Sequence, residues 1–248
     1  MKEEEILSQQ PFRRILRIAK VNSLLGINSL SGDTFQVIGS DKKIYKLHYA
    51  DKLSEAKQVE NNVLLFPQIF PKFHGREGRY LLFDWIEGRM LTKEDKDLSI
   101  YKKLGELCAD VHNSNQCIGQ DIDSYFVKRL KSIPDRILSQ NEKIKVEEKY
   151  AELKEKIKTD IVLDINDIHA KNFVIDKNQN VYLVDEGGVN HVIKGLGFAK
   201  AFLSWFNEEQ RKSFWEGYTA KHEGDYFDKD YETFVTIVEC VRAISFRA

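Results

Sequence analysis

The sequence is poor in the residues that build disulfide frameworks and structural metal sites. Its 248 residues include only three cysteines, Cys108, Cys117 and Cys240, which lie far apart and form no CxxC pair. An odd number of widely spaced cysteines argues against a disulfide framework and against a zinc site. We therefore expect the protein to work in a reducing compartment, the cytoplasm.

Proline and long apolar runs are also scarce. The chain has four prolines, which argues against long disordered linkers. No run approaches the roughly 20 apolar residues that a transmembrane helix needs. The first ten residues, MKEEEILSQQ, lack the apolar segment of a signal peptide. We expect no integral membrane segment and no secretion signal.

An excess of charge of either sign is missing as well. The 38 basic and 39 acidic residues leave a net charge of −1 at pH 7, so we expect no nucleic acid partner and no affinity for anionic membranes. Hydrophobic residues make up 42% of the chain and charged residues 31%, which is typical of a globular protein. The length suits one large domain or a two-lobed one.

The first third of the chain has the pattern of a β-rich unit. Residues 34–38 and 44–48 alternate, are rich in aromatic and β-branched residues, and flank the turn SDKK, which predicts a hairpin. Apolar residues at helical spacing predict a helix over 53–66. Residues 12–21 fit either an amphipathic helix or a lead-in strand. Two further short strands are expected over 70–74 and 80–83.

Beyond a connector at 84–88 the pattern becomes mainly helical. Helical spacing predicts helices over 101–113, 126–138, 142–158, 196–206, 208–222 and 230–246. Between the third and the fourth of these, LDINDIHAKNF and NVYLVDEGG predict two short strands and the turn between them. The pattern indicates an α+β, bilobal architecture: a small β-rich N-lobe over 1–83, a hinge over 84–88 and a larger helical C-lobe over 89–248.

The strand–turn–strand segment carries the strongest functional signal. It places Asp167, then Asn172 five positions later, and then Asp185 at the end of the second apolar run. In phosphoryl transfer, an Asp of this kind orients or deprotonates a hydroxyl, while an Asn and a second Asp bind the Mg²⁺ that bridges the phosphates. Hard oxygen ligands suit that ion. The alternative is a hairpin whose Asp and Asn satisfy the turn backbone.

Lys46 is the second candidate. It lies in IYKLHY, on a strand that should be half buried, and burying a lysine is costly unless the charge is paired. We expect Lys46 to contact nucleotide phosphates and to pair with Glu60 on the following helix, with Glu55 as the reserve partner. The alternative is a solvated lysine beside a solvated helix face.

These residues occur in an order that resembles the protein-kinase-like superfamily, with Lys46, Glu60, LLFDWIEGR, INDIHAKN and VDEGG following one another. The closer resemblance is to its small-molecule branch: aminoglycoside phosphotransferases, choline kinases and bacterial lipopolysaccharide sugar kinases. Their catalytic loop reads roughly HGDLHxxN, and here His169 follows Asp167 by two positions. NSLSGDTF is similar to their phosphate loop, and LGELCADVHN to one of their helices. The resemblance covers roughly residues 20–190 and implies the bilobal protein-kinase-like fold.

The resemblance implies a role for each matching position. Asp167 corresponds to the catalytic base, Asn172 and Asp185 to the Mg²⁺ ligands, and Lys46 with Glu60 to the phosphate lysine and its salt-bridge partner. The resemblance also implies further ATP-binding residues. Ser29, Ser31 and Gly32 would lie over the phosphates, the backbones of Asp84 and Ile86 beside the adenine, and Phe83 at the back of the pocket.

The sequence departs from the family pattern at several positions. Ile165 stands where the loop usually begins with His. Glu186 follows the metal Asp, where it could either tune the metal site or point away and pair with a base. No further Asp follows in GGVNHVIKGLGFAKAFLSWF, which argues against a standard antibiotic kinase. The phosphate loop has a single glycine.

We therefore expect an ATP- and Mg²⁺-dependent phosphotransferase whose acceptor is a hydroxyl of a small molecule, with a sugar-like acceptor favoured. The alternatives are a protein kinase, because DIHAKNF is also similar to HipA-type protein kinases, and a pseudokinase that binds nucleotide as a regulatory module. Among the other polar residues, His112 is expected to pack in the core, while His169 could brace the loop or approach the substrate. Trp205 and Trp215 are expected in the core.

Overall fold

The computed structural model describes residues 9–18, 24–31, 33–40, 42–114, 122–157, 161–223 and 228–247. The chain divides into two compact units. Unit 1 comprises residues 1–91 together with 171–187, and unit 2 comprises residues 92–170 together with 188–248. The segment that carries Asn172 and Asp185 therefore folds with the N-terminal part of the chain.

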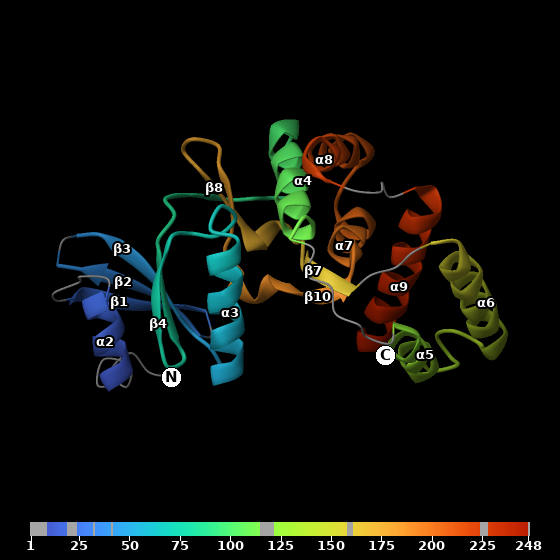
Figure 1. Ribbon diagram of the computed structural model, residues 1–248, viewed down its shortest axis with the longest axis horizontal. Coiled ribbons are helices and arrows are strands. Elements are labelled where there is room, and N and C mark those ends of the chain that lie inside the picture. The colour runs from blue at the N-terminus through green and yellow to red at the C-terminus, as the bar shows by residue number, and fades with distance from the viewer. Residues whose placement is uncertain are drawn as a thin grey trace. The chain divides into compact units, whose positions relative to one another are not determined.

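Unit 1 is built on a five-stranded antiparallel sheet in the order β1-β2-β3-β5-β4 (Figure 1). The strands are β1 (Leu24–Ser31), β2 (Thr34–Gly39), β3 (Ile44–Tyr49), β4 (Phe73–Glu77) and β5 (Tyr80–Asp84). The predicted hairpin is confirmed, with Thr34 opposite His48. On β2 the side chains alternate between buried and half-buried, as a strand with one face in the core requires.

Two helices flank this sheet. Residues 12–21, which fitted either a helix or a strand, contribute to helix α2 (Gln10–Ile18), and the predicted helix over 53–66 is α3 (Leu53–Leu65). Both helices contact β4 and β5, and β4 lies between them in Figure 1. On α3 the expected apolar stripe is only partly correct, because Ala56, Val59 and Val63 are buried but Leu64 is exposed.

A smaller sheet completes unit 1. It has the order β6-β8-β9, formed by β6 (Gly88–Met90), β8 (Phe173–Asp176) and β9 (Val181–Leu183). The connector expected over 84–88 begins at the end of β5 and ends at the start of β6. Backbone hydrogen bonds join β9 to the rest of the unit, because the Leu183 N–H donates to the Ile69 carbonyl at 2.8 Å.

Unit 2 is mainly helical, and the predicted helices are all present in its described part. They are α4 (Leu98–His112), α5 (Ile122–Ser132), α6 (Gln140–Lys156), α7 (Leu196–Ser204), α8 (Glu208–Lys221) and α9 (Lys229–Arg247). The sequence analysis missed β10 (Val189–Ile193), which pairs antiparallel with β7 (Ile161–Ile165). The predicted strand–turn–strand is therefore corrected: the first strand, β7, pairs with β10, while the second pairing is between β8 and β9. None of the described helices is long and apolar enough to cross a membrane.

Close helix packing forms the core of unit 2. A side chain at Gly217 would place its Cβ 1.9 Å from the Lys102 carbonyl oxygen, so α8 and α4 approach at backbone distance. The rings of Trp205 and Trp215 pack on phenylalanine rings of α7, α8 and the segment between them. Both tryptophans are half-buried, so the expectation that they lie in the core is only partly correct. On α6 the helical spacing predicts burial of both Ile144 and Tyr150. The prediction was wrong for Ile144, which is 52% exposed, and correct for Tyr150, which is buried. The Tyr150 ring stacks on that of Phe126, with 3.8 Å between the ring centroids.

Candidate functional site

A buried carboxylate fixes the end of β7. The Asp164 side chain is fully buried, and its Oδ2 accepts hydrogen bonds from the backbone N–H groups of Gly195 at 3.0 Å and Gly197 at 3.3 Å. Its Oδ1 lies 3.1 Å from Nε2 of His112. A carboxylate is costly to bury unless it is paired and hydrogen-bonded, and hydrogen bonds to a charged group contribute about 1.5–3 kcal/mol each. These contacts hold β7 to the start of α7.

The same contacts confirm the expectation for His112. Its ring is buried, and Nδ1 lies 2.8 Å from the hydroxyl of Tyr218 on α8. The imidazole therefore joins β7 to two helices of unit 2, which is a structural role. Burial is the main cause of the raised pKa of Tyr218, so the tyrosine stays a neutral hydrogen-bonding group at neutral pH.

The start of α7 is shaped by glycine. Gly195, at the N-cap, has φ +85°, a left-handed conformation that glycine adopts readily. A Cβ at Gly197 would lie 1.7 Å from the carbonyl oxygen of Ile165, so α7 packs directly on the backbone just before the segment that carries Asp167. Ile165 is itself buried. The loop that should begin with a bracing His is therefore braced by backbone contact with α7.

Helix α7 also supplies a cation to Asp167. Lys200 lies one turn beyond Gly197 and forms an ion pair with the Asp167 carboxylate, and the two side chains are 30% and 33% exposed. The loop backbone is held further, because the Trp205 indole N–H donates to the Ile168 carbonyl at 3.0 Å. Asp167 is thus a positioned, partly exposed carboxylate with a cationic neighbour.

The sequence analysis missed Lys200. A signal for it exists in the sequence, because it is the sole charged residue in the run 196–206, LGFAKAFLSWF. A single lysine in so apolar a helix implies a nearby anionic partner, since an unpaired buried charge is costly. Its partner is 33 positions earlier in the sequence, so only the fold identifies it.

Unit 1 contains a cavity of about 430 Å³ that is lined by five of its predicted site residues. Lys46, Asn172 and Asp185 form part of its polar lining, and the segment 84–86 contributes another part. The described lining residues are Leu30, Thr34, Lys46, Pro71, Asp84, Trp85, Ile86, Gly88, Met90, Lys171, Asn172, Val174, Val184 and Asp185. The lining combines apolar side chains with the cations Lys46 and Lys171 and with the oxygen-bearing side chains of Asn172 and Asp185. Such a lining suits a ligand that has a flat ring and phosphate groups.

Asn172 and Asp185 lie next to each other in this cavity. The Asn172 side-chain nitrogen is 3.4 Å from Oδ2 of Asp185. Among the described residues no group of three or more His, Cys, Asp or Glu side chains is arranged to hold a metal ion. Two adjacent oxygen-bearing side chains nevertheless fit Mg²⁺, because that ion usually binds one or two carboxylates and takes its remaining ligands from waters and substrate phosphates.

The predicted partner of Lys46 was wrong. The Lys46 ammonium contacts both carboxylate oxygens of Glu186, at 2.7 and 2.8 Å, and the carbonyl oxygen of Val184. Glu186 is almost completely buried. Of the two alternatives left open by the sequence, the structure shows the pairing with a base.

Glu60 is engaged elsewhere. Its carboxylate forms an ion pair with Arg76 of β4 at 2.6 Å. The reason is the position of α3, which packs against β4 and β5. A carboxylate on the middle of α3 is therefore within reach of a β4 cation, whereas the residue directly after Asp185 reaches Lys46. Glu55, the reserve partner, is exposed in the first turn of α3.

The other predicted nucleotide contacts divide into three groups. Asp84 and Ile86 line the cavity, as expected of a hinge. Phe83 is not among the described lining residues, because it is buried in β5 and its ring packs on Phe73 at 5.2 Å. Ser29 and Ser31 belong to β1, so the expected phosphate loop NSLSGDTF, residues 28–35, is largely strand, and Gly32 lies outside the described residues.

Several solved structures share this fold. A choline kinase, LicA from Streptococcus pneumoniae, superposes with a TM-score of 0.64 at 15% identity, over 95% of this chain and 90% of that one. The chain has the protein-kinase-like fold. A spectinomycin phosphotransferase in complex with ADP and spectinomycin matches with a TM-score of 0.65 at 16% identity, over 94% and 86% of the two chains. An ethanolamine kinase from Plasmodium vivax matches with a TM-score of 0.63 at 13% identity, over 98% and 81%.

These matches confirm the resemblance to the small-molecule branch at the level of the kinase-like fold. No protein-family model matches the chain, and no curated protein matches its sequence significantly. The likeness is therefore one of structure, and the roles of individual residues depend on the geometry described above.

The partner of Lys46 can be tested by removing each carboxylate in turn. In Glu186→Ala the buried ammonium of Lys46 loses its counter-charge, so we expect the free energy of unfolding to fall by about 3 kcal/mol, together with weaker ATP binding. Glu60→Ala removes a partly exposed ion pair and should cost at most about 1 kcal/mol. Thermal or urea denaturation measures the loss of stability in each variant, and titration with a fluorescent ATP analogue measures the loss of ATP affinity. A larger loss of ATP affinity in Glu60→Ala than in Glu186→Ala would restore Glu60 as the functional partner.

Proposed function

We propose that the protein is an ATP- and Mg²⁺-dependent phosphotransferase that moves the γ-phosphate of ATP to a hydroxyl group of a small molecule. The observation that carries the proposal is the unit 1 cavity, which brings Lys46, Asn172 and Asp185 together with the segment 84–86. Residues far apart in the sequence thus line one cavity, which supports a shared role in binding one ligand.

ATP would lie in this cavity with its base against the apolar walls. The backbones of Asp84 and Ile86 would bind the adenine edge, as the kinase-like fold suggests. The cations Lys46 and Lys171 line the same cavity and would bind the phosphates, while the backbone of the β1–β2 segment, with Ser29, Ser31 and Gly32, would cover them.

Asn172 and Asp185 would hold the magnesium ion. Bound there, the ion would bridge phosphate oxygens and neutralise the charge that develops on them during transfer. Glu186 would act next to this pair as the counter-charge that keeps the Lys46 ammonium in the cavity, through the contacts at 2.7 and 2.8 Å.

Asp167 would orient the acceptor hydroxyl and accept its proton. The hydroxyl oxygen forms a bond to the γ-phosphorus, the bond from that phosphorus to the bridging oxygen breaks, and ADP leaves with the electron pair. Lys200, paired with Asp167, would hold the carboxylate in position. Positioning and charge neutralisation supply most of the catalysis in such reactions, because the transition state needs little covalent help from the protein.

The acceptor is proposed to be a small molecule because the matched structures are named as kinases or phosphotransferases of choline, ethanolamine, spectinomycin and macrolides. The sugar-like acceptor favoured by the sequence and a protein acceptor remain the competing predictions. We place the reaction in the cytoplasm, as the three scattered cysteines suggest.

One observation favours the second candidate, a nucleotide-binding pseudokinase. The three donors of the Lys46 ammonium already contact Glu186 and the Val184 carbonyl, so a phosphate must share or replace those contacts. In a pseudokinase this arrangement would hold the site closed to phosphoryl transfer. Two experiments separate the candidates.

The first experiment tests the metal site. If Asn172 and Asp185 hold Mg²⁺ beside the phosphates, a chelator should weaken ATP binding to the wild-type protein by about tenfold or more, because the phosphate charge is then left without its cation. Asp185→Asn should bind ATP weakly with or without the chelator. Asp51→Asn, which changes an exposed aspartate of unit 1, is the matched control and should behave as wild type. Wild-type affinity that ignores the chelator would contradict the assignment.

The second experiment tests Asp167. In Asp167→Asn we expect nearly unchanged ATP affinity and a fall in turnover of about 10²-fold or more, the scale of losing a positioned acid–base group. The melting temperature should change little, because the lost ion pair is partly exposed and worth about 1 kcal/mol or less. ADP formation over a panel of alcohols measures turnover. Unfolding of the variant would make Asp167 a structural turn residue. Equal ADP formation by variant and wild type would remove Asp167 from the catalytic role. No ADP formation by wild-type protein that binds ATP–Mg²⁺ would favour the pseudokinase.

A further inference from the structure

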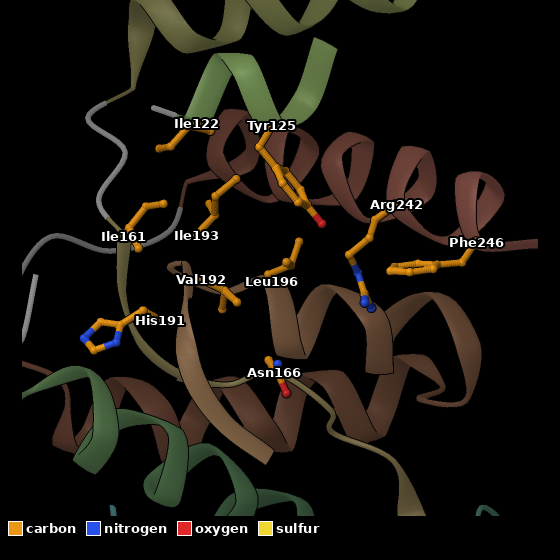
Figure 2. A pocket seen from close by; sticks show the side chains of 10 residues that line it. All are labelled: Ile122, Tyr125, Ile161, Asn166, His191, Val192, Ile193, Leu196, Arg242 and Phe246. Carbon is orange, nitrogen blue, oxygen red and sulfur yellow. The ribbon is translucent and has the colours of Figure 1, made fainter. Parts of the chain in front are cut away.

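Unit 2 contains a second cavity, of about 190 Å³, beside the segment that carries Asp167 (Figure 2). Asn166, the residue before Asp167, is part of its lining. Arg242 of α9 lines it as well. The pKa of that guanidinium is raised, first by its hydrogen bonds to Glu239 and in smaller part by the negative charge of Asp167. The cavity is therefore close to the carboxylate proposed to orient the hydroxyl.

The walls of this cavity are mainly hydrocarbon. Ile122, Ile161, Ile193 and Leu196 come from α5, β7, β10 and α7, and all four are buried or nearly so. Figure 2 shows Tyr125 and Leu196 directed toward one another across the view. Apolar ligand surface placed against such walls gains roughly 25 cal/mol for each Å² removed from water. A sugar, by contrast, needs a hydrogen-bond partner for nearly every hydroxyl that it buries.

The rim of the cavity is cationic. Arg129 lies over the rings of Tyr125, at 5.3 Å, and Phe246, at 4.2 Å, and both rings line the cavity. The lining residues that the structure describes include no carboxylate. The anionic neighbours are already paired, since Glu239 binds Arg242 at 2.6 Å and Asp167 binds Lys200. A cationic acceptor would therefore find no carboxylate to bind among the described lining residues.

The size of the cavity limits the ligand. Cavities for drug-sized ligands run from about 300 to 1,000 Å³, so about 190 Å³ suits a molecule of roughly one ring. Resting on the proposed phosphotransferase activity, we propose that this cavity holds the body of the acceptor and selects an uncharged alcohol with a compact hydrocarbon body over cationic amino alcohols and sugars.

The cavity contains its own reporters for a test. The methyl groups of Ile122, Ile161 and Ile193 line it, whereas Ile69 is buried in unit 1. With isoleucine methyls ¹³C-labelled, cyclohexylmethanol added to the ADP–Mg²⁺-bound protein should shift the three cavity signals and leave Ile69 in place. Choline and glucose at the same concentration should shift none of the three. The same three compounds are then compared as phosphate acceptors, and cyclohexylmethanol should give the highest kcat/KM.

Two variants in α5 test the role of the rim. Arg129→Glu reverses the charge over the aromatic rings, and we expect it to improve choline binding at least about tenfold relative to cyclohexylmethanol, because a like charge is replaced by an opposite one. Lys128→Glu makes the same change in net charge at an exposed position of the same helix and should leave the preference unchanged.

A variant in β10, Val192→Phe, tests whether the ligand occupies the cavity. It fills the cavity from a half-buried position and should abolish the cyclohexylmethanol shifts while ATP affinity stays the same.

The outcomes separate this inference from the proposed function. If choline or glucose shifts the cavity methyls and is the preferred acceptor, the selectivity proposed here is wrong while the phosphotransferase activity stands. If cyclohexylmethanol shifts the cavity methyls but no compound is phosphorylated by protein that binds ATP–Mg²⁺, the cavity chemistry stands and the acceptor role is overturned. If cyclohexylmethanol is phosphorylated without shifting these methyls, the acceptor binds elsewhere and the cavity assignment is wrong.

Discussion

The geometry of unit 2 depends on one buried carboxylate. Asp164 has no exposed surface, and it binds the backbone at both Gly195 and Gly197 while contacting His112. Because a buried carboxylate is costly without hydrogen-bond partners, the groups that bind Asp164 are held in place. It fixes the start of α7 against the backbone of Ile165. Lys200, one turn further along α7, then meets Asp167. These contacts brace the segment that carries Asp167 without the His or the late Asp that the family pattern leads one to expect.

Much of the fold could be predicted from the sequence because its elements have strong local patterns. The β2–β3 hairpin alternates around a polar turn, and the helices of unit 2 have clear apolar spacing. The elements that were missed or misplaced are short or decided by remote contacts. β10 is five residues long, VNHVI, and only its pairing with β7 makes it a strand. The β1 strand extends into the polar segment that suggested a loop, because backbone pairing with β2 overrides the low strand propensity of Asn and Ser.

The candidate site shows the same division. Lys46, Asn172 and Asp185 could be located from their local motifs, and the cavity brings them together. Their electrostatic partners could not, because a salt bridge depends on which face a helix presents after packing. The sequence analysis assigned Glu60 to Lys46. Because α3 packs on β4, Glu60 instead forms an ion pair with Arg76, and Lys46 forms one with Glu186. The ammonium of Lys46 and its carboxylate are both nearly buried, and removing one partner of such a pair is expensive, so this pairing is expected to persist.

The central claim is that the γ-phosphoryl group of ATP passes to an alcohol. The most direct measurement incubates the protein and Mg²⁺ with cyclohexylmethanol and with a mixture of small-molecule alcohols, using ATP labelled with ³²P at the γ or at the α position in parallel. The account predicts that γ label enters an organic phosphate monoester that phosphatase hydrolyses, that α label stays in ADP, and that Asp167→Asn slows the transfer. Label reaching the acceptor from the α position, or γ label found only in unreacted ATP and inorganic phosphate, would contradict it.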